Sequence, residues 1–70
     1  MNKKDTPETE LRRKLFELRT EHADLDVAIG AIEESRVPDH LALTRLKKRK
    51  LILKDQIAVI EDQLTPDIIA

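Results

Sequence analysis

The chain places apolar residues at alternating intervals of three and four positions over most of its length, and this spacing constrains its fold more than any other feature. Such a pattern puts the apolar side chains along one stripe of an α-helix, where they can pack against a second helix. In the first half the steps are 4, 3, 4, 3, 4 and 3, and this inner stripe consists of Leu11, Leu15, Leu18, His22, Leu25, Ile29 and Ile32. In the second half the steps are 3, 4, 3, 4, 3 and 4, and the inner stripe consists of Leu43, Leu46, Lys50, Leu53, Ile57, Ile60 and Leu64.

The two inner stripes are mirror images about the middle of the chain. Reversing the second stripe pairs 11 with 64, 15 with 60, and so on to 32 with 43, and the residue numbers of each pair sum to 75. The mirror point falls at Val37-Pro38, and a proline disfavours helix at the residue before it. We therefore predict an all-α fold, an antiparallel two-helix hairpin of the coiled-coil type that forms a single unit over residues 1–70.

Local signals predict where the two helices begin and end. Asp5 or Thr6 can cap the first helix, and Pro7 suits its first turn because the missing N–H would be unpaired there. Asp39 can cap the second helix, and Pro66 discourages its continuation. The predicted boundaries are about 7–35 for the first helix, 36–38 for the turn, 39–64 for the second helix and 65–70 for a short tail.

Two segments resemble the YdcH-like family of small bacterial proteins. One is the EHxxLD stretch at 21–26, and the other is the RLKKRKLxLKDxI stretch at 45–57. The likeness extends over about residues 11–64. Members of that family are helical hairpins with no assigned activity, so the resemblance implies a hairpin fold and a bacterial source, and it transfers no catalytic residue.

The composition argues against a catalytic domain. The chain has 70 residues, no cysteine and one aromatic residue, so disulfides, thiolate zinc sites and thiol nucleophiles are excluded, and little interior is available for a pocket. A formal charge of −1 gives no overall bias toward nucleic acid or membrane. We expect no enzymatic activity, no cofactor and no metal.

Apolar runs in the chain are short compared with the roughly 18 residues of a membrane span. The charged opening at residues 1–5 is not followed by the apolar stretch of a secretory signal. We therefore expect a cytoplasmic protein with no membrane partner.

Both predicted helices also carry apolar residues on the side opposite their inner stripe. A lone hairpin would leave these residues in water, and two helices bury little area, so we expect self-association into a four-helix or larger bundle. Another cytoplasmic protein is a further possible partner. Gly30 either allows close approach of another helix or is a tolerated accident. The predicted oligomer interface consists of Phe16, Ala23, Val27, Gly30, Leu51, Ile52 and Val59, with Ala58 on the same side.

Two polar residues interrupt the inner stripes. His22 falls opposite Leu53, and Lys50 falls opposite Leu25. A polar group in such a stripe lowers stability but rejects slipped pairings, so we interpret both residues as determinants of register. The alternative is a pH-sensitive or ligand-contacting pair. Asp26 or Glu21 can pair with Lys50, whereas His40, near the turn, is interpreted as a solvated surface residue.

Six basic residues lie in one ten-residue segment of the second helix, residues 45–54. They suggest an alternative function, weak association with nucleic acid. Several of them have acidic neighbours on the first helix, the run winds around the helix, and the segment has no aromatic residue for base stacking. The cations left to contact a polyanion are Arg45, Lys48 and Arg49. A small homo-oligomeric coiled-coil interaction module is the function that the sequence favours.

Overall fold

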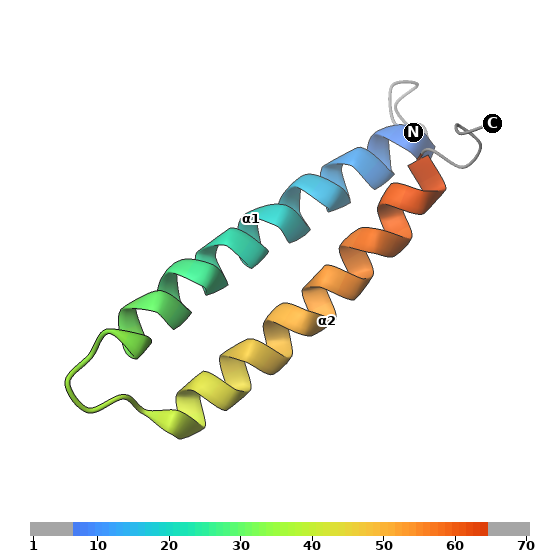
Figure 1. Cartoon of the computed structure of the whole chain (residues 1–70). Coiled ribbons are helices and arrows are strands. Elements are labelled where there is room, and N and C mark those ends of the chain that lie inside the picture. Colours follow the sequence, from blue (N-terminus) through green and yellow to red (C-terminus); the bar gives the residue numbers. More distant parts are fainter. Residues whose placement is uncertain (1–6, 65–70) are drawn as a thin grey trace.

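The computed structural model describes residues 7–64, and within this range it contains two helices joined by a short link (Figure 1). Helix α1 spans Pro7–Glu33 and helix α2 spans His40–Leu64. The two helices lie side by side and run in opposite directions, so the first residues of α1 lie close to the last residues of α2. The predicted all-α helical hairpin is therefore confirmed.

The link between the helices covers residues 34–39 and is longer than the predicted turn of three residues. At its start the backbone N–H of Glu34 donates to Gly30 and that of Ser35 donates to Ile32, both at 3.1 Å. On the α2 side, Pro38 disfavours helix at Val37 and Asp39 acts as a cap, so the helix begins at His40, one residue later than predicted. On the α1 side, the helix ends at Glu33, two residues earlier than predicted. The predicted cap at residues 5–6 and the predicted tail at 65–70 lie outside the described residues.

Asp39 caps the N-terminus of α2. Its Oδ1 accepts a hydrogen bond from the backbone N–H of Ala42 at 3.0 Å, and its carbonyl oxygen accepts one from the N–H of Leu43 at 3.0 Å. The side-chain bond satisfies a backbone donor that has no partner within the helix.

We expect Asp39→Ala to lower the free energy of unfolding by about 1 kcal/mol, because it removes this side-chain acceptor. Asp39→Ser keeps an acceptor at the same position and should retain most of the stability. Urea unfolding followed by circular dichroism measures both. Equal stability of the alanine variant and the parent chain would show that the cap is not needed.

The core is a single row of side chains between the helices. Among residues 7–64, the buried hydrophobic residues all belong to the predicted inner stripes: Leu15, Leu18, Ile29, Leu43, Leu53 and Ile60. Leu53 is fully buried, and it forms one cluster with Leu15, Leu18 and Ile60. Leu11 and Leu64, a predicted pair, both pack against this cluster. The core therefore follows the predicted mirror pairing.

Candidate interaction surface

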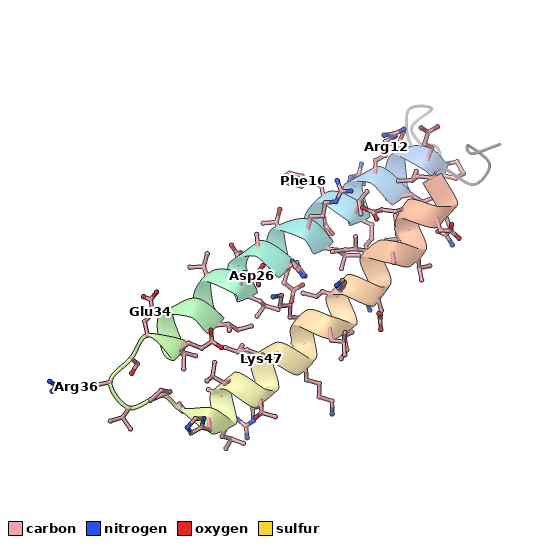
Figure 2. All side chains as sticks on the ribbon, in the orientation of Figure 1. Arg12, Phe16, Asp26, Glu34, Arg36 and Lys47 are labelled. Atoms are coloured by element: carbon pink, nitrogen blue, oxygen red, sulfur yellow. The ribbon has the colours of Figure 1, made fainter. Side chains whose placement is uncertain are left out.

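Large apolar side chains also lie on the outside of the hairpin, away from the contact between the helices. On α1, Phe16 is 71% exposed and Val27 is 73% exposed. On α2, Leu51 and Val59 are 60% and 57% exposed. Figure 2 shows the Phe16 side chain pointing away from α2. These predicted interface residues are thus placed where a partner can reach them.

On α1 the outer residues form a second continuous stripe, with steps of 4, 3, 4 and 3. We call it the α1 outer stripe, and it consists of Phe16, Thr20, Ala23, Val27 and Gly30. It includes Thr20, which was not among the predicted interface residues because only apolar residues and Gly30 were selected. The Thr20 hydroxyl donates to the backbone oxygen of Phe16 at 2.9 Å, so it needs no other partner. The regular 4–3 spacing was the signal that would have identified it.

Gly30 lies at the end of the α1 outer stripe nearest the link. A Cβ atom built at this position would meet nothing within 4 Å. Packing inside the hairpin therefore does not require a glycine here.

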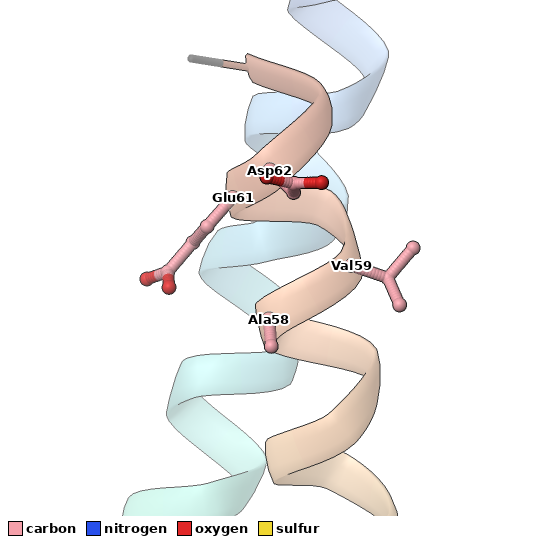
Figure 3. Close-up of a pocket in the computed structure, with 4 residues that line it drawn as sticks. All are labelled: Ala58, Val59, Glu61 and Asp62. Atoms are coloured by element: carbon pink, nitrogen blue, oxygen red, sulfur yellow. The ribbon is translucent and has the colours of Figure 1, made fainter. Parts of the chain in front are cut away.

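The outer face of α2 is more divided. Leu51, Ile52 and Val59 are exposed, but charged residues separate them along the helix. The surface hollow in Figure 3 is lined by Ala58, Val59, Glu61 and Asp62, all from α2, and their side chains point in different directions. This hollow is an open patch on one helix and not an enclosed pocket.

Two exposed apolar residues near the link were not predicted. Val37 is 82% exposed and Leu41 is 62% exposed. Val37 lies in the link, outside both helices, whereas Leu41 lies on the outer face of α2, seven residues before Lys48, and was missed although the heptad spacing reaches it.

Ion pairs between the helices flank the core on both sides. Arg19 pairs with Glu61, Lys47 Nζ lies 3.0 Å from Glu33 Oε2, and Arg49 Nη2 lies 3.1 Å from Glu21 Oε2. The side chains are about half exposed, so each pair contributes about 0–1 kcal/mol. Their main consequence is that they fit one alignment of the two helices.

The two polar residues of the inner stripes meet at one carboxylate. Lys50 Nζ forms an ion pair with Asp26, and His22 Nδ1 lies 3.8 Å from Asp26 Oδ2. The hydrogen bond from Lys50 lowers the pKa of Asp26 below its ordinary value, against a smaller opposing effect of desolvation. Sequence reasoning left Asp26 and Glu21 as alternative partners of Lys50, and the structure selects Asp26 because Glu21 is held by Arg49.

The family of the chain follows from a comparison with known protein families. The family described as Protein of unknown function (DUF465) matches residues 15–61, which is about two-thirds of the chain. The chain belongs to the DUF465 family. No curated protein and no solved structure matches it. The matched range contains both segments on which the YdcH-like resemblance rests, and the YdcH-like name itself stays a prediction.

The basic stretch of this DUF465 chain is partly neutralised by α1. Lys47, Arg49 and Lys50 each pair with an acidic residue of that helix. Arg49 was predicted to be available to a polyanion, but its guanidinium donates to Glu21. A phosphate would therefore have to compete with this carboxylate for Arg49, whereas Arg45 and Lys48 have no such competitor within residues 7–64. Among the described residues, Arg45 and Lys48 make no ion pair.

Residues 7–64 of the DUF465 chain contain no group of three or more His, Cys, Asp or Glu side chains that could hold a metal ion. His22 has one carboxylate beside it, that of Asp26, and this carboxylate also pairs with Lys50. Neither α1 nor α2 offers the length of apolar sequence that crossing a bilayer requires.

The lowered pKa of Asp26 predicts a pH dependence of stability in the DUF465 chain. Ionised Asp26 stabilises the folded state above the pKa of an unfolded aspartate, about 4, and this contribution is lost as the pH falls through the lower folded-state value. We expect the urea concentration at the unfolding midpoint to decrease as the pH is lowered below about 4. The Lys50→Gln variant should show a weaker dependence of this midpoint on pH. Identical pH profiles of the parent and the variant between pH 7 and 2.5 would contradict the assignment.

Lys50 also allows a test of its effect on register in this DUF465 chain. Its side chain is 36% exposed and lies on the inner stripe. We expect Lys50→Leu to raise the free energy of unfolding by about 1 kcal/mol, because apolar burial outweighs the loss of a half-exposed ion pair. The same variant should broaden the distribution of oligomer masses, because a polar residue that rejects slipped pairings is gone. Thermal unfolding and native mass spectrometry measure the two effects, and lower stability with an unchanged mass distribution would argue for a structural ion pair.

Proposed function

We propose that this DUF465 chain is a small homo-oligomeric coiled-coil module that acts through protein–protein contacts in the cytoplasm. The observation that carries the proposal is the exposure of large apolar side chains on the outside of a hairpin whose core is a single row. Phe16, Val27 and Leu51 are each at least 60% exposed. Several large apolar side chains exposed on so small a fold are typical of an interaction site.

Energetics support self-association. A core in a chain of about 70 residues rarely supplies more than about 3–5 kcal/mol. Burying one exposed Phe, Leu or Val side chain contributes about 1.5–3 kcal/mol. Covering the outer residues with further copies in a four-helix or larger bundle therefore adds stability comparable to that of the hairpin itself.

Light scattering coupled to size-exclusion chromatography tests the proposal. The chain has a mass of 8.1 kDa, and we expect a multiple of this mass that decreases on dilution. A mass of 8.1 kDa at every concentration up to the millimolar range would overturn the homo-oligomeric module.

A gel-retardation experiment with a nonspecific duplex distinguishes the protein–protein module from the weaker alternative, association with nucleic acid. Phosphate contacts weaken steeply between about 50 and 200 mM salt. We expect no retention at either concentration, because three of the cations are held by α1. Retention at about 50 mM that is lost at about 200 mM would favour the nucleic-acid function instead.

A further inference from the structure

The α1 outer stripe is complementary to itself when one copy is reversed. Ala23 lies at its centre, Phe16 lies seven residues before it, and Gly30 lies seven residues after it. Seven residues are close to two helical turns, so all three lie on the same side of α1. Along the stripe the side chain is therefore large at Phe16, small at Ala23 and absent at Gly30.

We propose that two copies pack through the α1 outer stripe in antiparallel orientation, with both Ala23 residues near the two-fold axis and Phe16 of each copy seated over Gly30 of the other. The inference rests on the proposed function, because it names the partner and the face of the same module. Helix α1 then has α2 on one side and α1 of the second copy on the other.

The size pattern fits this arrangement at every position of the stripe. Phe16 is 71% exposed and meets Gly30, around which the hairpin leaves open space. Val27 is 73% exposed and falls opposite Thr20, whose hydroxyl is already bonded to its own helix. Each large side chain therefore faces a smaller one, as close packing of two helices requires.

The glycine itself supports the inference. Glycine is unfavourable in a helix interior compared with alanine. Nothing within the hairpin would touch a Cβ at position 30, so the fold of one copy does not explain the residue. A second helix approaching at this point does explain it.

Charges on one flank of the stripe are complementary to themselves in the antiparallel orientation. One flank of the stripe carries Arg12 and Arg19 toward the start of α1 and Asp26 and Glu33 toward its end, whereas the other flank carries Glu17 and Asp24. Reversing one copy brings the two arginines of the first flank toward Asp26 and Glu33 of the same flank on the other copy. A parallel arrangement would place Phe16 on Phe16 and Gly30 on Gly30, so that the largest side chains would meet each other. Side chains such as Arg12 and Glu33 are 65% and 48% exposed, so they can reach a second copy in addition to their partners within the chain.

The outer face of α2 lacks such a stripe. Lys48, Asp55 and Asp62 recur every seven residues among its apolar residues. A helix packed over Leu51 and Ala58 would have to bury these charges, and one packed over Ile52 and Val59 would have to bury Gln56 between them. The α1 outer stripe has no charged residue between Phe16 and Gly30, which is why we assign the contact to α1.

Cysteine crosslinking tests the arrangement in the full chain, which has no natural cysteine. The key variant is Ala23→Cys, which places one thiol from each copy near the axis. A second sample mixes Thr20→Cys with an affinity-tagged Val27→Cys, which face each other across the axis. The control is Thr44→Cys, an exposed position on α2. Each sample is oxidised under mild conditions, and its mass is measured in parallel without oxidation.

We expect Ala23→Cys to form a covalent dimer, the mixed sample to form more tagged–untagged dimer than either homodimer, and Thr44→Cys to stay uncrosslinked. Efficient homodimers of Thr20→Cys and of Val27→Cys would show a parallel contact and overturn the proposal. An oligomeric mass with crosslinking at Thr44→Cys and none at Ala23→Cys would overturn it while leaving the proposed function intact. A monomeric mass in every unoxidised sample would overturn both.

Discussion

Leu53→Ala is expected to unfold most of the chain at room temperature when the chain is dilute enough to be monomeric. Leu53 is fully buried, and its cluster includes Leu15, Leu18 and Ile60. Truncating a buried leucine costs about 2–5 kcal/mol, because apolar contacts are lost and a cavity is left. A hairpin of this size has about 3–5 kcal/mol to lose, so a single truncation consumes most of it. Far-ultraviolet circular dichroism with urea titration measures the loss of helix.

The matched control is Leu51→Ala, two residues away in the same helix. Leu51 is 60% exposed, so the same chemical change removes little buried surface within one hairpin. We expect its effect on the unfolding free energy of the monomer to stay within about 0.5 kcal/mol. Equal losses for the two variants would mean that the helices do not pack with Leu53 between them.

The inner stripes explain why so much of this fold was predictable from the sequence. A 4–3 repeat assigns each residue to a side of its helix without reference to the rest of the chain, and the mirror symmetry about Pro38 then fixes the direction of the second helix. Leu53 and Leu51 illustrate the result: the repeat places one inside and the other outside, and their exposures are 0% and 60%.

The ion-pair partners of individual side chains were less predictable. The heptad spacing shows which residues lie near one another, but it does not show which of them form a contact. Asp26 and Glu21 both lie within reach of Lys50 along the sequence pattern. The choice between them depends on Arg49, which forms an ion pair with Glu21 and leaves Asp26 as the partner of Lys50. The length of the link is a similar case: Pro38 marks where the helix is interrupted, while the residue at which α2 begins depends on the cap at Asp39.

The outer face was predicted where residue type and position agreed, and missed where they did not. Phe16 and Val27 are apolar and lie opposite the inner stripe, so both were identified. Thr20 lies between them on the same stripe, but it was not identified because threonine is a polar residue. Its hydroxyl donates to the backbone oxygen of Phe16, so the side chain needs no other polar partner. Position on the helix was thus a better guide to this surface than residue type.

Phe16→Asp is expected to dissociate the oligomer into 8.1 kDa chains while leaving the hairpin folded. Phe16 is 71% exposed in one copy, so the hairpin itself loses little when the ring is removed. In the antiparallel contact the new carboxylate would be buried without a partner, on the side of the second copy that carries Glu33 and Glu34. Burying an unpaired charge costs several kcal/mol, and each 1.4 kcal/mol is a factor of ten in affinity, so association should weaken at least 100-fold. Light scattering across a dilution series measures the mass, and circular dichroism shows whether the helices persist.

Val59→Asp is the control that makes this result specific to α1. Val59 is 57% exposed on the outer face of α2, so the same type of substitution places a carboxylate on a similarly exposed apolar site. If α1 carries the contact, the Val59→Asp chain keeps its oligomeric mass, because that face of α2 stays in water in both states. If instead Val59→Asp dissociates the oligomer and Phe16→Asp does not, the contact lies on α2, and the match between Phe16 and Gly30 has no part in assembly. The two variants change the net charge by the same amount, so a difference between them reports the position of the contact and not the charge of the chain.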